Sequence, residues 1–479
     1  MSNLTDLLPA GAGGKQVSFV ASGTLSSGQA VVLNSDGTVS GVSPISQALG
    51  SNVQYTTGNT AFVATAFDSN ANKVVIAYRN GSNSSYGEVV IGTVSGTSIS
   101  FGTAVVFETA NSQYMSLAFE SSNNKIVISY KDGGNSGYGT SIVGTVSGTS
   151  ISFGTAVVFA SHEIDYTSTS YDENAGKMVI SYSRSSTGAG TAIVGTVSGT
   201  SISFGTAVVF ATYGTYMSNV FDSNSNNTVI AFRDNNNSNY GTAIVGTVSG
   251  TSISFGSAVV FENADSQYIS CTYESNTNKV VIAYTDNGNS GYGTAIVGTV
   301  NGTSISFGTA VVFESGFSDY IGSTYDYRSK KVCIVYRDGN TGQDGTIAIG
   351  VVSGNNISFE SPVTFESGEG VWNSAAFNTE NNTVIIGYMN GQNANRGEAV
   401  VFQNASSNNA DFIGITAEAI SDTASGSVTI KGGISTNVTG LTPNATYYVQ
   451  DDGTLSTTAS DVLAGKALSS TSINLDYTT

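Results

Sequence analysis

Residues 72–78 read Asn72-Lys-Val-Val-Ile-Ala-Tyr78, and this short apolar segment returns six more times along the chain. Each copy closes on an aromatic residue, and these are Tyr78, Tyr130, Tyr182, Phe232, Tyr284, Tyr336 and Tyr388. Consecutive closing aromatics lie 52 residues apart, except Tyr182 and Phe232, which lie 50 residues apart. A constant period of about 50 residues, filled with short strands, is typical of a β-propeller or a solenoid.

One repeat, residues 60–107, reads as four short strands joined by turns. The strands cover residues 61–67, 73–78, 88–94 and 98–107, and four such strands make one propeller blade. The second strand has apolar residues on both sides of its pleat, which predicts burial on both faces between stacked blades. The composition agrees, because β-branched and aromatic residues are abundant and only 10% of the 479 residues are charged.

The seventh repeat lacks a fourth strand after residues 398–402, and the start of the chain can supply it. Residues 39–49 resemble residues 94–104, so we expect Ile45 to Leu49 to pair with the third strand of the last repeat. Such pairing removes an unpaired sheet edge, whereas an open solenoid would need capping repeats at both ends. The sequence therefore predicts an all-β, seven-bladed β-propeller over residues 39–403, closed by an N-terminal strand.

The two flanks, residues 1–38 and 404–479, do not follow the repeat, and ring closure would bring them together. Both contain a hairpin pattern with an Asp-Gly turn, at residues 31–39 and 447–455. We therefore expect a small composite β-domain built from both ends, in which residues 1–38 also provide an N-terminal anchor peptide.

The formal net charge of −18 argues against nucleic acids and anionic membrane surfaces as partners. No stretch approaches the ~20 apolar residues that cross a bilayer, and the opening residues lack the pattern of a secretory signal peptide. With one histidine and two cysteines, Cys271 and Cys333, we expect free buried thiols, no metal site and no cofactor. Acidic loops such as residues 132–139 are better explained as turns than as calcium sites.

The loops between blades differ most among the repeats, and in a propeller they share one rim with the loops after the second strands. Loops held by a rigid scaffold are where binding usually resides. The candidate contact residues on this rim are Tyr86, Tyr138, Tyr240, Tyr292, His162, Asp165, Tyr213, Phe317 and Asp319.

A second aromatic set stands at one register, where each inter-blade loop enters the first strand. Its members are Phe62, Tyr114, Tyr166, Tyr216, Tyr268, Tyr320 and Trp372. We expect these rings around the mouth of the central channel and favour a structural role, in which they wedge between blades. The alternative is a stacking platform for sugar rings.

Loop carboxylates raise the question of glycoside hydrolysis, which needs two carboxyl groups about 5 Å or about 6.5–9.5 Å apart. Glu163, Asp165, Asp319 and Glu369 are such carboxylates, but the sequence does not reveal their separation. The Ser-x-Asp-x-Gly-x-x-Trp box of sialidase-like propellers is absent. We therefore expect a protein without enzymatic activity and keep a glycan-degrading propeller enzyme as an alternative.

Both ends of the chain resemble a known kind of protein. The opening Leu4-Thr-Asp-Leu-Leu-Pro-Ala-Gly-Ala-Gly-Gly-Lys15 and residues 19–39, 412–420, 440–455 and 464–470 look like termini of structural proteins from marine tailed bacteriophages. The resemblance implies a virion component, such as a tail fibre or capsid fibre, whose small domain serves as a module around variable inserts. It carries over no catalytic residue.

From this resemblance we expect a phage virion appendage protein that displays its propeller to a host-surface glycan or protein. The alternative is a purely architectural capsid or tail decoration. The expected partners are other virion proteins and a host glycan, and formation of a homo-oligomer is left open. The expected location is the virion, after synthesis in the host cytoplasm.

Overall fold

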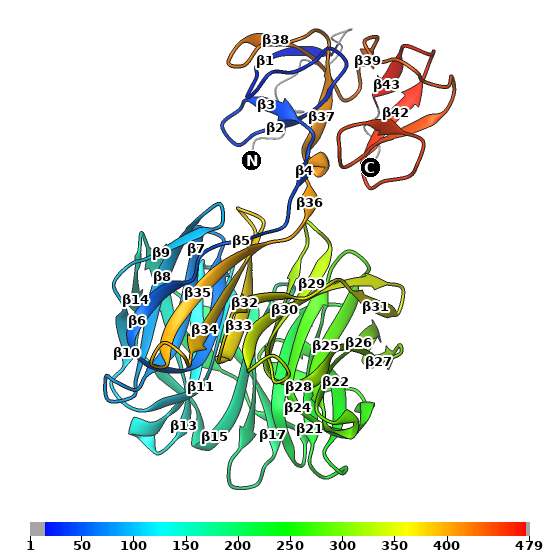
Figure 1. The fold of residues 1–479 in the computed structure, drawn as a ribbon. Helices are drawn as coiled ribbons and strands as arrows, with labels where there is room; N and C mark the ends of the chain where they lie inside the picture. Colours follow the sequence, from blue (N-terminus) through cyan, green and yellow to red (C-terminus); the bar gives the residue numbers. More distant parts are fainter. Residues whose placement is uncertain (1–14, 476–479) are drawn as a thin grey trace. The chain divides into compact units, whose positions relative to one another are not determined.

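The computed structural model describes residues 15–475, which fall into two compact units. One unit comprises residues 48–403, and the other combines the residues up to Gln47 with those from Asn404 onward. Both units consist of strands (Figure 1). Within residues 15–475 the helical segments are short 3₁₀ turns, η2 (Gly133–Asn135), η3 (Asn287–Asn289) and η4 (Asn409–Asp411). The all-β prediction is confirmed.

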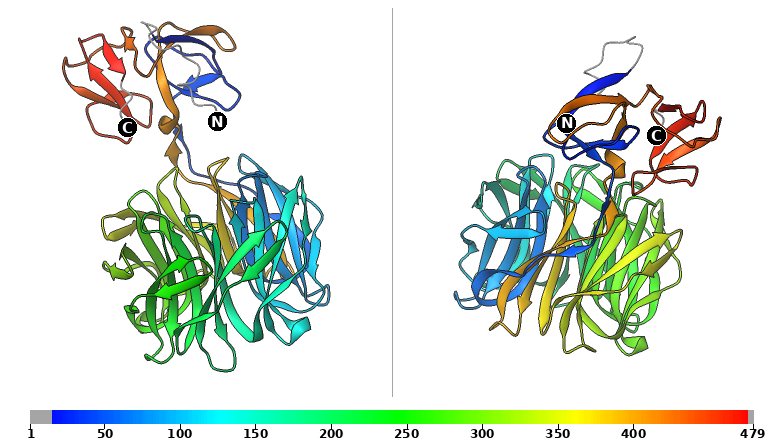
Figure 2. Two further views of the ribbon diagram at one scale, coloured as in Figure 1. Left: turned by 180° about the vertical axis from the view of Figure 1, so that it is seen from behind. Right: turned by 45° about the horizontal axis from the view of Figure 1, so that its top comes forward.

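Each repeat in residues 48–403 forms an antiparallel sheet whose strands follow chain order from the inside outward. The innermost strands are β6 (Val53–Asp68), β11 (Ser112–Glu120), β15 (Val157–Asp172), β20 (Gly214–Asp222), β24 (Val259–Glu274), β28 (Val311–Asp326) and β33 (Gly370–Asn378). The second strands are β7 (Lys73–Asn80), β12 (Lys125–Asp132), β16 (Lys177–Arg184), β21 (Asn227–Asp234), β25 (Lys279–Asp286), β29 (Lys331–Asp338) and β34 (Thr383–Asn390). Figure 2 shows from two sides how these sheets stand next to one another.

The third strand of each repeat carries two short outer segments on its free edge. The third strands are β8 (Tyr86–Ser95), β13 (Tyr138–Ser147), β17 (Gly190–Ser198), β22 (Tyr240–Ser249), β26 (Tyr292–Asn301), β30 (Asp344–Ser353) and β35 (Arg396–Gln403). The first outer segments are β9 (Ser98–Phe101), β14 (Ser150–Phe153), β18 (Ser201–Phe204), β23 (Ser252–Phe255), β27 (Ser304–Phe307), β31 (Asn356–Phe359) and β5 (Ala48–Leu49). The second outer segments are β10 (Val105–Glu108), β19 (Val208–Ala211), β32 (Val363–Glu366) and the first residues of β6, β15, β24 and β28.

The second strand is buried on both faces, as its sequence predicts. Val74 to Tyr78 in β7 are all fully buried, and Val280 to Tyr284 in β25 are buried in the same way. Neighbouring sheets approach closely at a glycine between the two outer segments. A Cβ atom on Gly154 would lie 1.9 Å from the carbonyl oxygen of Thr200, in the turn of the next repeat. Only glycine lets the backbones of adjacent repeats come so near.

The N-terminal strand closes the last repeat, as predicted, but in a different register. Leu49 of β5 pairs with Phe402, and Val53 of β6 pairs with Ala399. Leu49 therefore occupies the position that Phe101 takes in the first repeat. The next residue agrees, because the Gly50 N–H donates a hydrogen bond to Val401 O, and the equivalent Gly102 N–H donates one to Ile91 O. The predicted match of residues 39–49 with residues 94–104 is therefore wrong by three residues. The register is set by Gly50, which approaches the backbone of Thr97 in the neighbouring repeat. Gly154 approaches Thr200 in the same way.

The boundary at residue 39 is also wrong. Strand β3 (Val39–Gly41) forms a hairpin with β2 (Ala30–Leu33), because the Asp36-Gly37 turn returns the chain beside β2. Strand β4 (Pro44–Ile45) pairs with β36 (Ser406–Ser407). All of these residues belong to the unit made from the two ends of the chain, so the propeller begins at Ala48.

The terminal unit contains two five-stranded sheets of identical strand order. The first is β1 (Gln16–Val20), β38 (Ser425–Ile430), β37 (Phe412–Thr416), β2 and β3. The second is β39 (Ile434–Ser435), β43 (Ile473–Leu475), β42 (Leu463–Ala467), β40 (Thr446–Val449) and β41 (Leu455–Ser456).

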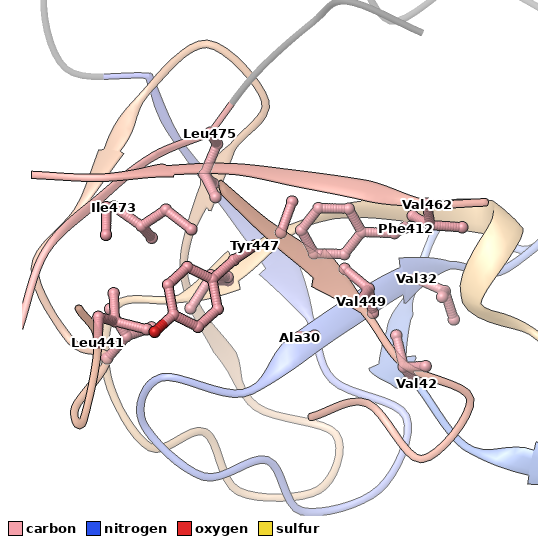
Figure 3. Packing of buried hydrophobic residues seen from close by; sticks show 14 residues of the cluster. Ala30, Val32, Val42, Phe412, Leu441, Tyr447, Val449, Val462, Ile473 and Leu475 are labelled. Atoms are coloured by element: carbon pink, nitrogen blue, oxygen red, sulfur yellow. The ribbon is translucent and has the colours of Figure 1, made fainter. Parts of the chain in front are cut away.

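Local details of the two sheets also match. Asp36 and Asp452 each accept hydrogen bonds from the backbone N–H and the hydroxyl of the threonine two residues later. Both β2 and β40 have a register shift where they pair with β37 and β42. The unit is therefore a tandem pair of one module, and the propeller is inserted between β3 and β37 of the first copy. The two copies share one hydrophobic core, which includes Phe412 and Tyr447 (Figure 3).

A buried hydrogen bond links most neighbouring repeats of the propeller. The closing aromatic of a second strand donates its hydroxyl to a glutamate at the end of the preceding repeat's outer edge, as in Tyr284 to Glu262 at 2.9 Å. The same bond joins Tyr130 to Glu108 and Tyr336 to Glu314. In the fourth repeat both partners change together, because Phe232 faces a position occupied by Ala211. The third repeat is an exception, because the buried Tyr182 keeps its hydroxyl although Ala160 stands at the glutamate position.

We predict that Glu262→Ala destabilises the propeller, by about 1–3 kcal/mol, because it leaves the buried Tyr284 hydroxyl without its acceptor. The double variant Glu262→Ala/Tyr284→Phe recreates the natural Ala211–Phe232 pair and should recover part of that loss. Denaturant midpoints of the three proteins measure the effect. A double variant that is no more stable than Glu262→Ala would show that the hydrogen bond does not carry this energy.

Candidate binding site at the mouth of the central channel

Seven aromatic side chains, one from each repeat, form a closed ring that we call the mouth ring. Its members are Phe62, Tyr114, Tyr166, Tyr216, Tyr268, Tyr320 and Trp372. Each ring contacts the next, with centroid distances from 4.4 Å to 5.3 Å, and the last pair, Trp372 and Phe62, is the closest at 4.4 Å. The repeats therefore close on themselves. A count of seven blades stays the prediction of the sequence, with which this ring agrees.

The backbone at the mouth ring is unusual in every repeat. All seven residues have positive φ angles between 46° and 56°, a left-handed conformation that bulky side chains rarely adopt. The pairing of the innermost strand with the second strand shifts at this point each time, for example between Gln113 and Ser116. Such a bulge re-aims a side chain. Strained backbone of this kind costs about 1–3 kcal/mol per residue and gathers at functional sites.

The mouth ring surrounds a cavity of about 340 Å³. A second layer of the wall is formed by the residue that follows each aromatic: Val63, Met115, Thr167, Met217, Ile269, Ile321 and Asn373. A deeper cavity of about 310 Å³ shares part of this layer and is lined further in by serine hydroxyls such as those of Ser116, Ser218 and Ser270. An aromatic entrance above a polar interior has the size and character of a small-molecule or sugar pocket.

Four basic side chains stack on the mouth ring. Arg79 lies 4.9 Å from the centroid of Phe62 and Arg337 lies 5.0 Å from that of Tyr320. Lys131 and Arg233 lie 5.9 Å from the centroids of Tyr114 and Tyr216. Cations over aromatic faces are attracted by the electron-rich ring. All four occupy the position directly after the closing aromatic of the second strand, and this register is the signal that sequence reasoning missed.

Three of these cations are paired with carboxylates. Lys131 Nζ lies 2.7 Å from Glu163 and 2.9 Å from Asp165. Arg233 Nε lies 2.6 Å from Asp265, and Arg337 Nε lies 2.6 Å from Asp319. Burial raises the pKa of Asp319, although Arg337 opposes this shift.

Arg79 differs from the other three. Among residues 15–475 it has no carboxylate partner, and its side chain makes one long hydrogen bond there, of 3.5 Å from Nη1 to Asn111 Oδ1. Its Nε is buried without a hydrogen-bond partner in the same range. Burial lowers the pKa of the Arg79 guanidinium.

The predicted rim tyrosines lie away from the cavity. Tyr86, Tyr138, Tyr240 and Tyr292 are half-buried at the first positions of their third strands, and none of them lines either cavity. The rings that were expected to be mainly structural are the ones that line it. Of the other predicted residues, only Asp165 and Asp319 lie beside the mouth ring, through their ion pairs with Lys131 and Arg337.

The remaining rim candidates are scattered. Tyr213 and Phe317 are exposed, and each packs over a glycine, Gly188 and Gly291 respectively. His162 lies on β15 with its ring 6.0 Å from that of Tyr182. Burial, aided by the nearby charge of Arg184, lowers the pKa of His162, which leaves it neutral at physiological pH.

Other chemical groups in the described part of the chain are not gathered into a site. Residues 15–475 contain no cluster of three or more His, Cys, Asp or Glu side chains that could hold a metal ion. Cys271 and Cys333 are buried thiols that form no disulfide, as predicted, and burial raises the pKa of the Cys271 thiol to about 12. Over the same range no helix is long and apolar enough to cross a membrane.

Comparisons with known proteins identify the fold. No family model matches the chain, and no curated protein matches it in sequence. The BP39L lectin from Burkholderia pseudomallei is similar in structure, with a TM-score of 0.54 and 10% identity over 73% of this chain and 99% of that chain. The Cps50 (Swd1) β-propeller domain from Myceliophteria thermophila has a TM-score of 0.51 and 7% identity over 74% and 99%. Both likenesses lie at the level of the fold, which is that of a β-propeller.

We predict an inverted order of stability at the mouth ring. Tyr216→Gly should be more stable than Tyr216→Ala by about 1 kcal/mol, because glycine adopts a positive φ without steric cost. At an ordinary exposed strand position such as Val106, the alanine variant should be the more stable one. Thermal unfolding of the four variants measures both differences. If the alanine variant at residue 216 is as stable as the glycine variant, the backbone at this position is not strained.

Proposed function

We propose that the protein is a non-enzymatic carbohydrate-binding propeller and that the mouth ring holds the sugar. The observation that carries this proposal is the closed ring of seven aromatics, each presented by a bulge at a strained positive φ. A ring made only to wedge blades apart would not need the same costly backbone in every repeat. Strain that recurs at one cavity is expected where a ligand must be met by preorganised side chains.

The chemistry of the mouth ring suits a sugar. Its five tyrosines combine an apolar face with a hydroxyl that donates and accepts hydrogen bonds, and a sugar likewise has an apolar face edged by hydroxyls. Burial raises the pKa values of Tyr114, Tyr166, Tyr268 and Tyr320, so these hydroxyls stay neutral at physiological pH. The net charge of −18 disfavours nucleic acids as the ligand. A neighbour in fold, BP39L, is named as a lectin, which supports the same class of ligand here.

The arrangement of acidic groups favours binding over hydrolysis. The loop carboxylates Glu163 and Asp165 pair with Lys131, and Asp319 and Glu369 pair with Arg337. Carboxylates committed to ion pairs in this way are poorly suited to serve as a general acid and a nucleophile or base.

We also propose, from the resemblance of both flanks to phage structural proteins, that the terminal unit attaches to a virion and the propeller is displayed for contact with a host-surface glycan. This part of the proposal rests on the sequence resemblance alone. It predicts co-purification of the protein with phage particles.

The test of sugar binding uses Trp372, which is the only tryptophan of the chain and a member of the mouth ring. We predict that an oligosaccharide selected on a glycan array changes the fluorescence of Trp372, and that Tyr216→Ala weakens its binding about tenfold, or about 1.4 kcal/mol. The matched control is Tyr138→Ala, which removes a tyrosine of the rim. Retained affinity in Tyr216→Ala with loss in Tyr138→Ala would move the site to the rim. Absence of any glycan binding would favour the architectural alternative.

A further inference from the structure

The four cations over the mouth ring occupy equivalent positions but have different partners. The pair Arg233 and Asp265 is the most useful comparison, because Asp265 lies three residues before the ring residue Tyr268. The residue three positions before Tyr114 is Asn111, and Asn111 is the group that Arg79 contacts. Asn111 is thus an uncharged near-isostere of Asp265 at the equivalent place. The natural sequence leaves Arg79 without the counter-ion that Arg233 has.

The surroundings of Arg79 make an unpaired charge unfavourable. The guanidinium packs on Phe62, its Nε is buried without a partner among residues 15–475, and its contact with Asn111 is long. Arg79 as a whole is half-buried, and a charge that is partly removed from water without a counter-ion is destabilising. An anionic group from outside the chain would supply both the charge and the missing acceptor. Arginine is suited to this task, because its planar fork binds a carboxylate or a sulfate through two parallel hydrogen bonds.

The same sector of the mouth ring is the one without phenol hydroxyls. Phe62 and Trp372 are neighbours with centroids 4.4 Å apart, and all five other members of the ring are tyrosines. Phe62 and Trp372 therefore form an apolar sector of the mouth ring beside Arg79, whose side chain has no carboxylate partner among residues 15–475. The rest of the ring consists of tyrosines. A ligand with one apolar face and one negative substituent matches this sector and Arg79.

We infer that the sugar bound at the mouth ring is anionic and that its carboxylate or sulfate pairs with Arg79 beside Phe62 and Trp372. This inference rests on the carbohydrate-binding function proposed above and adds the chemical class of the ligand. Arg79 sets the specificity for charge, while stacking on the mouth ring holds the sugar itself.

The experiment compares matched sugars on the full-length protein, with Trp372 fluorescence and calorimetry as readouts. One arm uses a uronic-acid oligosaccharide and its carboxyl-reduced form, and the other uses a sulfated oligosaccharide and its desulfated form. The wild-type protein should bind the anionic member of at least one pair about tenfold more tightly than its neutral counterpart. The arm that shows the preference distinguishes a carboxylate from a sulfate.

Two substitutions should remove the preference for the anionic sugar over its neutral counterpart. Arg79→Gln deletes the charge, and Asn111→Asp gives Arg79 an internal carboxylate of the kind that Arg233 has in Asp265. Each should lower affinity for the anionic sugar to that for the neutral sugar. Arg184→Gln is the control, because it removes an exposed arginine that does not stack on the mouth ring. Melting temperatures confirm that each variant is folded.

The two proposals fail in different ways. If neutral and anionic sugars bind equally well and perturb Trp372, or if Arg79→Gln keeps the anionic preference, the assignment of Arg79 is overturned while sugar binding at the mouth ring stands. If neither member of any pair perturbs Trp372 or releases heat, the carbohydrate-binding function is overturned, and the inference with it.

Discussion

The pairing of β35 with β5 and β6 is the interaction on which the arrangement of the propeller depends. It brings a strand from the start of the chain to the last repeat and leaves no third strand with an empty edge. Closure also places Trp372 against Phe62, so that the mouth ring has no gap. At about 1–3 kcal/mol each, seven left-handed aromatics would cost about 7–20 kcal/mol, comparable to the net stability of a whole domain. Only a closed, mutually packed set of repeats can hold them in place.

Much of this fold could be predicted from the sequence, because the repeat itself carries the information. The two-faced burial of residues 74–78 follows from apolar residues on both sides of the pleat, and closure follows from the missing strand after residue 402. The register of closure could not be found by matching serine and isoleucine patterns. It depends on Gly50, whose role is to let the backbone of Thr97 approach, and this is a property of two neighbouring repeats.

The candidate site was only partly predictable. The position of the aromatic set at the channel mouth follows from its register, but the positive φ of these residues contradicts their intrinsic preference and had no sequence signal. The four basic residues over the ring share one position in the repeat, so they could have been identified from the sequence. Their ion pairs could not, because the partners lie on different strands. Lys131 and Arg233 pair with carboxylates on the innermost strand of the next repeat, whereas Arg337 pairs with Asp319 on the adjacent strand of its own repeat. The contrast between Arg79 and its paired equivalents therefore emerges only in three dimensions.

The most direct measurement is a crystal structure of the full-length protein grown with its best-binding oligosaccharide. We expect a sugar ring inside the mouth ring, stacked on Phe62 and Trp372, with the backbone of all seven aromatics at positive φ. A sugar bound at the outer rim near Tyr138 or Tyr292, with the mouth ring empty, would overturn the assignment of the binding site to the mouth ring.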